Sequence, residues 1–134
     1  MKNIFSIFIL AIVFSCSSDD GGTTGGSAFP KTTTMNFEVT TTDDRDASIT
    51  TTIDDVDLVE LSSTSPYIKP YENRVVSLQT VFKLKYEDLS PMPFVAYQAT
   101  LIIKDVNNIV KTQSFNVTQQ GQIFQIEYMF SDDN

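Results

Sequence analysis

The feature that most restricts the fold of this chain is an alternation of apolar and polar residues that begins near residue 29 and continues almost to the end. It is clearest between Arg74 and Glu87. Every second residue of that stretch would lie on one face: Val76, Leu78, Thr80, Phe82, Leu84 and Tyr86. A period of two is typical of a half-buried antiparallel strand, whereas an amphipathic helix would repeat at i, i+3, i+4 and i+7. We therefore expect an all-β fold in which helix is nearly absent.

Six further segments are predicted to be strands, which with residues 74–87 makes seven. Two alternate clearly, with these residues facing inward: Val95, Tyr97, Ala99, Leu101 and Ile103 in one, and Phe124, Ile126, Tyr128 and Phe130 in the other. Four are weaker: residues 35–41 with Met35, Phe37 and Val39 inward, 48–53, 56–61, and 109–118 with Phe115 and Val117 inward.

The segments between these strands carry turn-forming residues. Residues 43–46, 107–108 and 119–122 are rich in Asp, Asn and Gln and are predicted to be hairpin-type turns. Prolines mark two longer loops, at residues 62–73 and 90–93. Six or seven strands connected in this way predict an antiparallel two-sheet β-sandwich, an immunoglobulin-like Greek key. A small closed β-barrel is the alternative.

The first 15 residues are predicted to be a signal peptide. Lys2 precedes an apolar run of 11 residues that ends at Phe14, which is too short for the ~20 residues of a membrane-spanning helix. The run ends in Val13-Phe14-Ser15-Cys16, which resembles the lipobox of bacterial lipoproteins. The resemblance covers four residues; Val13, Ser15 and Cys16 fit, and Phe14 is bulkier than is usual. It implies cleavage before Cys16 and lipid on that cysteine, and the alternative is an ordinary secretory signal followed by a chance cysteine.

Residues 16–28 are predicted to be a flexible tether. Four of the five glycines of the protein lie here, and a dozen residues of such a coil reach about 20 Å. Directly after the cysteine stand Ser17, Ser18, Asp19 and Asp20, which look like the export signal of surface-exposed lipoproteins in the Bacteroidota. The resemblance implies an outer-membrane lipoprotein displayed on the cell surface; the alternative is the periplasmic face of that membrane. Residues 29–134 then form one folded domain.

Charge and composition narrow the class of function. Lys2 is the only charged residue of the leader, so the mature chain has 9 − 1 = 8 basic and 17 acidic residues, a formal net charge of 8 − 17 = −9. Such a surface repels nucleic acid. The chain has no histidine, and its one cysteine is assigned to the anchor, which leaves the domain without the commonest general base or a thiol nucleophile. Glu38 and Glu127 are predicted on solvated strand faces, and no phosphate loop or serine-hydrolase motif is present. We expect no catalysis and no cofactor.

Two acidic triplets of the form Asp-Asp-x-Asp are candidate calcium ligands: Asp43, Asp44 and Asp46, and Asp54, Asp55 and Asp57. Calcium takes six to eight oxygen ligands. Residues 47–53 form the strand between the triplets and span about 23 Å, so the two triplets cannot share one ion. Neither triplet matches the calcium-loop pattern, which favours solvated turn acids over a metal site.

A second candidate site is the proline-containing loop, where Tyr67, Lys69 and Tyr71 could form a recognition surface. Alternatively, both rings cover an open end of the core. The leading interpretation is a lipid-anchored interaction module that binds a protein or a glycan through loops at one end of the sandwich. The alternative is a structural accessory subunit of an outer-membrane assembly. The first predicts exposed apolar residues in loops, and the second predicts them on a sheet face or an unprotected edge strand.

The lipobox resemblance predicts that Cys16 is acylated. Mass spectrometry of the membrane-extracted protein should show a lipid-modified Cys16 at the amino terminus, and Cys16→Ala should accumulate as the uncleaved precursor. Recovery of a soluble mature chain with a free Cys16 thiol would contradict the prediction.

Overall fold

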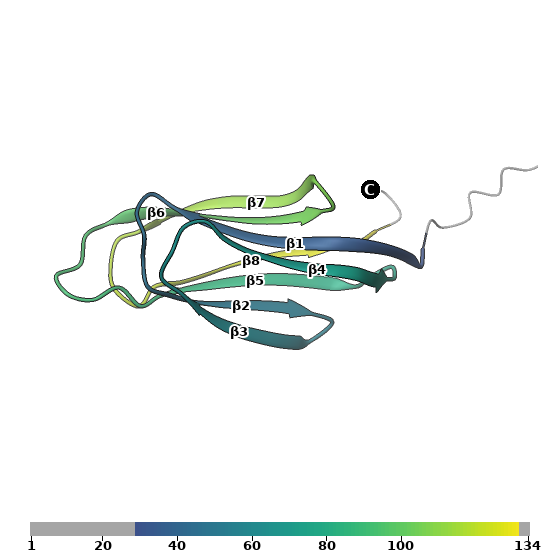
Figure 1. Ribbon diagram of the computed structural model, residues 1–134, viewed down its shortest axis with the longest axis horizontal. Helices are drawn as coiled ribbons and strands as arrows, with labels where there is room; N and C mark the ends of the chain where they lie inside the picture. The colour runs from purple at the N-terminus through teal and green to yellow at the C-terminus, as the bar shows by residue number, and fades with distance from the viewer. Residues whose placement is uncertain (1–28, 132–134) are drawn as a thin grey trace, which may run out of the picture.

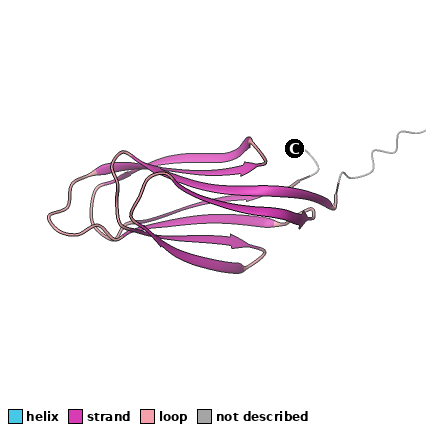
Figure 2. Cartoon of the chain, viewed as in Figure 1, coloured by secondary structure: helices cyan, strands magenta, loops and turns pink. Residues whose placement is uncertain are grey.

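The computed structural model describes residues 29–131, and these form two antiparallel sheets packed face to face (Figure 1). The eight strands are β1 (Lys31–Thr41), β2 (Ala47–Ile53), β3 (Val56–Ser62), β4 (Tyr67–Val76), β5 (Val81–Asp88), β6 (Tyr97–Asp105), β7 (Asn108–Val117) and β8 (Ile123–Met129). One sheet has the order β4-β1-β6-β7 and the other β3-β2-β5-β8. All other described residues lie in loops and turns (Figure 2). Within residues 29–131 there is no helix long and apolar enough to cross a membrane.

The predicted all-β sandwich is confirmed, with eight strands in place of six or seven. The two sheets stay separate, so the closed-barrel alternative does not apply. β4 returns to lie beside β1 after the β2–β3 hairpin has formed in the opposite sheet, which is a Greek-key type of connection. The strand order differs from that of constant-type immunoglobulin domains, in which the first two strands pair, because β1 and β2 here belong to different sheets.

The prediction of one long strand over residues 74–87 is wrong. β4 ends at Val76 and β5 begins at Val81 in the other sheet. A tight turn joins them: the Thr80 amide donates to the Ser77 carbonyl at 3.2 Å, the Ser77 amide donates to Thr80 Oγ1 at 3.0 Å, and Gln79 has a φ of 70°. Because Val76 and Thr80 both point inward from opposite sheets, the alternation runs through the crossover without a break.

The predicted loop over residues 62–73 is also mostly wrong, because Tyr67, Lys69 and Tyr71 lie on strand β4. Pro70 stands opposite Asn36 of β1. A proline has no amide to donate and is tolerated where a strand has an open side. β4 is the outer strand of its sheet, which allows the strand to form despite the proline.

Of the predicted hairpin turns, only the one near residues 107–108 joins paired strands, β6 and β7. Residues 43–46 and 119–122 instead connect different sheets. The second hairpin joins β2 and β3 through Asp54 and Asp55, whose φ values of 47° and 64° are those of a type I′ turn. The loop predicted at residues 90–93 is confirmed, and it extends beyond Val95. The prediction that Val95 faces inward is wrong, because its side chain is 60% exposed.

The core consists of the inward residues of both sheets and extends fully to only one side of the sandwich. On the β7–β8 side, Phe115 and Phe124 stack with ring centroids 4.6 Å apart. At the centre, the fully buried Phe82 contacts Phe37 and Phe130, with centroids 6.4 and 5.6 Å away. The predicted inward positions are largely confirmed, with these buried: Met35, Phe37, Val39, Val76, Phe82, Leu84, Tyr86, Tyr97, Ala99, Leu101, Ile103, Val117, Ile126 and Phe130.

The position of Phe82 predicts a large effect on stability. Phe82→Ala in residues 29–134 should lower the free energy of unfolding by about 3–5 kcal/mol, because it removes a buried ring and leaves a cavity between the sheets. Lys83→Ala, on the outer face of the same strand, is the matched control and should cost less than about 1 kcal/mol. Urea unfolding measures both, and equal losses would contradict the core assignment.

Candidate protein-interaction surface

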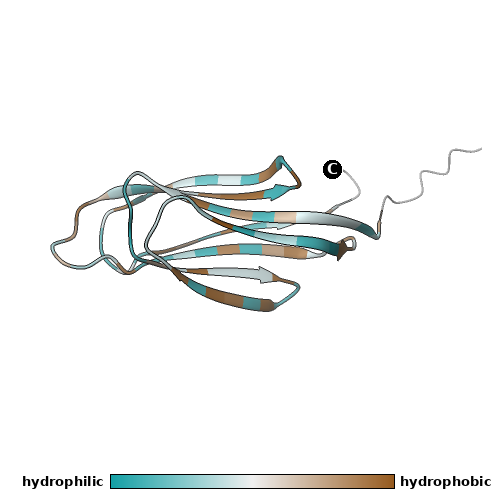
Figure 3. Ribbon diagram, in the orientation of Figure 1, coloured by the Kyte–Doolittle hydropathy of each residue, from teal (hydrophilic) through white to brown (hydrophobic). Residues whose placement is uncertain are grey.

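Strand β3 is the most exposed apolar element of the sandwich. We call its seven residues, Val56–Ser62, the β3 edge. Val56, Val59 and Leu61 are 73%, 60% and 78% exposed, and Leu58 is 38% exposed. Figure 3 shows β3 at the margin of the molecule, with much of its length coloured as hydrophobic. Apolar residues point from both faces of β3, Val56 and Leu58 from the inner face and Val59 and Leu61 from the outer face.

The β3 edge also has free backbone hydrogen-bonding groups. Residues of an antiparallel pair alternate between pairs that exchange hydrogen bonds and pairs that do not. The Asp54 amide donates to the Val81 carbonyl, so the even-numbered residues of β2 bond to β5 and its odd-numbered residues bond to β3. It follows that Val56, Leu58, Glu60 and Ser62 bond to β2. Asp57, Val59 and Leu61 direct their amides and carbonyls to the open side.

The other three edge strands are less suited to pairing. β4 carries Pro70 and Lys69, and β7 carries Lys111. Proline and lysine are the residues with which proteins commonly block strand edges. On β8 the exposed apolar residues stand at the two ends, Ile123 and Met129, and the exposed residues between them are the polar Gln125 and Glu127. β3 has neither lysine nor proline and has its exposed apolar residues close together.

β3 and β4 come together at one end of the sandwich and separate at the other. The Glu60 carboxylate accepts hydrogen bonds from the Tyr67 hydroxyl at 2.5 Å and from Lys69 Nζ at 2.9 Å. The hydrogen bond from Tyr67 lowers the pKa of Glu60 most, and the bond from Lys69 lowers it further. Burial, followed by the hydrogen bond to Glu60, raises the pKa of Tyr67. Towards the β2–β3 turn there is a cleft of about 670 Å³, lined by Ile53, Asp54, Val56, Asp57, Leu58, Tyr71, Asn73, Arg74 and Val75.

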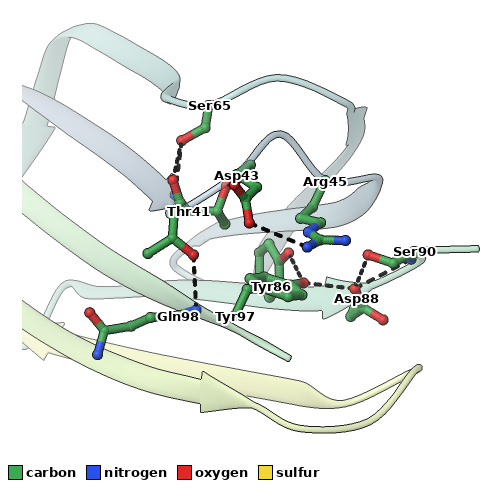
Figure 4. Close-up of polar contacts among 10 residues, drawn as sticks. Thr41, Asp43, Arg45, Ser65, Tyr86, Asp88, Ser90, Tyr97 and Gln98 are labelled. Carbon is green, nitrogen blue, oxygen red and sulfur yellow. Dashed lines mark hydrogen bonds and ion pairs between the residues drawn. The ribbon is translucent and has the colours of Figure 1, made fainter. Parts of the chain in front are cut away.

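A buried polar cluster lies at the opposite end of the sandwich (Figure 4). The Tyr97 hydroxyl donates to Asp88 Oδ1 at 2.7 Å and lies 2.5 Å from the Tyr86 hydroxyl. Asp88 is 1% exposed and also accepts from the Ser90 hydroxyl and from the Gly121 amide. Burial raises the pKa of Asp88, but these hydrogen bonds outweigh burial and the net shift is downward. Burial first, and then the bonds to Tyr86 and Asp88, raise the pKa of Tyr97.

Arg45 covers this cluster from the β1–β2 loop. Its guanidinium lies 4.7 Å from the centre of the Tyr97 ring and 3.4 Å from Asp43 Oδ2. The cluster thus joins the β1–β2 loop, β5, β6 and the β7–β8 loop. Its hydroxyls and carboxylate are satisfied internally, which makes it a structural cluster and not an open site. Sequence reasoning missed Asp88, because a carboxylate at the end of an alternating strand is indistinguishable from a solvated one.

The two acidic triplets lie at opposite ends of β2, as the strand length predicted. Five of the six carboxylates make separate contacts: Asp43 with Arg45, Asp44 with the Ser65 amide, Asp54 with the Val81 amide, Asp55 with Lys83, and Asp57 with Thr52. Within residues 29–131 no three acids, cysteines or histidines are placed to hold a metal ion together.

The residues predicted as a ligand loop are partly used inside the domain. Tyr67 and Lys69 both bind Glu60, as described above. The Tyr71 hydroxyl lies 2.5 Å from Thr51 Oγ1, and its ring meets that of Phe37 edge-on at 5.5 Å. Both tyrosines are half-buried and pack against the core from strand β4.

The predicted lipidation and export residues, Cys16, Ser17, Ser18, Asp19 and Asp20, lie outside the described residues. No protein-family model matches the chain, and comparisons with curated proteins and with solved structures found no match either. The candidate surface therefore depends on the geometry of residues 29–131 alone.

The environment of Asp88 predicts a pH-dependent contribution to stability. Its pKa is lower in the folded chain than in the unfolded chain, so its contribution is fully present above the unfolded value of about 4 and is lost as the pH falls through the folded value. Asp88→Asn should destabilise the domain at neutral pH and reduce the loss of stability in acid. Glu87→Gln, on the outer face, should keep the wild-type dependence. Urea unfolding between pH 2 and pH 7 measures this, and parallel curves for wild type and Asp88→Asn would contradict it.

Proposed function

We propose that the protein is a lipid-anchored, non-catalytic interaction module that binds a protein partner by adding a strand to the β3 edge. The observation that carries this proposal is the combination of three open backbone positions, Asp57, Val59 and Leu61, with exposed apolar side chains on both faces of the same strand. This is the arrangement predicted for a subunit that docks by an unprotected edge strand.

Strand addition would use the two properties of β3 separately. The open amides and carbonyls provide main-chain hydrogen bonds, which supply affinity with little regard to sequence. Val59 and Leu61 on the outer face, and Leu58 on the inner face, would contact side chains of the added strand and supply selectivity. An extended, apolar segment of a protein is the ligand class that fits both.

The anchor and the location of the protein are part of the proposal. Lipid on Cys16 and the tether would hold the domain within about 20 Å of the membrane, on the cell surface if the Ser-Ser-Asp-Asp sequence acts in export. The chain enters the domain at Phe29, at the end that also carries the β2–β3 turn (Figure 1). The β3 edge runs along the side of the sandwich from this end, so a neighbour on the same membrane could reach it.

Recognition of a protein or a glycan through loops is the second candidate, and one feature favours it. The β5–β6 loop exposes Leu89, Met92 and Val95, at 42%, 71% and 60%. These side chains are aliphatic, whereas the tyrosines that could stack on a sugar are half-buried on β4. The loop therefore supports a protein contact more than a glycan site.

Proline substitution at an open amide tests the proposal. Val59→Pro removes a free amide without removing a bond to β2, so the domain should fold and lose its partner at least tenfold in affinity capture of the tagged lipoprotein from its own membrane. Leu61→Lys should act in the same direction, because a charged lysine blocks an edge.

Gln125→Pro is the matched control. The Asp88 amide donates to the Gln122 carbonyl, which places the bonds between β5 and β8 at the even-numbered residues and leaves Gln125 open on the far edge of the same sheet. This variant should keep the partner. Docking at β3 would be contradicted if both variants kept the partner, or if Gln125→Pro lost the partner and Val59→Pro kept it. Loss of the partner only after truncation of residues 91–95 would favour docking at the loop.

A further inference from the structure

We infer that the β3 edge pairs with the β3 edge of a second copy of this chain, antiparallel and centred on Val59. This inference rests on the proposed function and names the partner. It follows from two properties of β3, the positions of its open backbone groups and the order of its charges, which are independent of each other.

The open backbone groups restrict the register. In a two-fold antiparallel pair whose axis is normal to the sheet, bonded residues must be those that are open on both copies, namely Asp57, Val59 and Leu61. Centring on Val59 pairs Val59 with itself and Asp57 with Leu61 in both directions, so all three open residues of each copy are bonded. If the two-fold axis passed through Leu58 or Glu60, only two of the three open residues of each copy would bond to a residue of the other β3 strand.

The charges restrict the register in the same way. Like charges directly opposite one another destabilise a sheet, which excludes centres at Asp57 and at Glu60, where an acid would face itself. About Val59, the Asp57 position faces Leu61 and the Glu60 position faces Leu58. No acid of the strand then meets an acid.

The segments flanking β3 agree with this register. The acidic turn residues Asp54 and Asp55 of one copy would stand beside Thr64 and Ser63 of the other, which are uncharged. The Glu60 carboxylate is held towards β4 by Tyr67 and Lys69, away from the joined edges. Pairing would make one continuous sheet from the two β3-β2-β5-β8 sheets, with Val59 and Leu61 of both copies on its outer face.

The size of the contact indicates where pairing occurs. One strand of seven residues on each side buries less than the ~1,200–2,000 Å² of a stable complex in solution. Copies held on one membrane meet at a high effective concentration, which compensates for a weak contact. We therefore expect pairing between anchored copies, and little between copies released from the membrane.

Cysteine cross-linking of the full lipoprotein in its own membrane tests the register. Cα atoms of a bonded antiparallel pair lie ~5.5 Å apart, within disulfide range, so Val59→Cys should give a cross-linked dimer on oxidation. Asp57→Cys and Leu61→Cys, each alone, place their cysteines about 13 Å apart along the strands and should not cross-link. Co-expressed with different tags, the last two should cross-link to each other. The unsubstituted chain, whose one cysteine is Cys16, controls for background.

The outcomes separate this inference from the proposed function. A dimer with Val59→Cys, and with the mixed Asp57→Cys and Leu61→Cys pair, supports self-pairing about Val59. If no cross-link forms but Val59→Pro still loses a different captured protein, self-pairing is overturned and docking at β3 stands. If Leu61→Cys, expressed without Asp57→Cys, forms a cross-linked dimer, the register centred on Val59 is overturned. If no cross-link forms and Val59→Pro retains everything that the wild type captures, both are overturned.

Discussion

The structure depends on burial of the facing apolar sides of two sheets, and the extent of that burial determines which parts of the domain are closed. With one cysteine in the chain, no internal disulfide can assist. Phe82, Phe37 and Phe130 form the centre of the core, and stacking of Phe115 on Phe124 carries it to the β7–β8 side. On the β3–β4 side, the half-buried Ile53, Tyr67 and Tyr71 form the margin of the core. Beyond them β3 is held by β2 and by the contacts of Glu60.

The two ends of the sandwich are stabilised by different chemistry. At one end Asp88, Tyr86 and Tyr97 form a buried hydrogen-bonded cluster that Arg45 covers, so the crossing loops are fixed by satisfied polar groups. At the other end the β2–β3 turn projects with no equivalent contact to β4, and the cleft opens there. The hydrogen-bonded end and the β7–β8 side position the sheet β3-β2-β5-β8, and its outer strand β3 remains exposed.

The sequence predicted the sandwich because alternation reports directly which residues face a core, and the buried residues of β1, β5 and β6 follow it. It did not predict where the chain changes sheet, since Val76 and Thr80 keep the same phase on both sides of the turn at Gln79. It misplaced Tyr67 and Tyr71 because proline usually interrupts a strand, and whether β4 is an edge strand depends on distant pairing with β1. The β3 edge left one signal in the sequence: in Val-Asp-Leu-Val-Glu-Leu, two adjacent apolar residues break the alternation and place apolar side chains on both faces.

An edge that can accept a strand is also exposed to unspecific aggregation, and the two acids of β3 limit that risk. A strand of valine and leucine alone would pair in any register and with any copy. Asp57 and Glu60, three residues apart, leave few registers in which no acid meets another, and of these only the one about Val59 bonds all three open positions. The formal net charge of −8 on the chain opposes random association of whole domains at long range. The same acids that keep the edge soluble thus make pairing selective, which is the property that separates a docking strand from an aggregation-prone one.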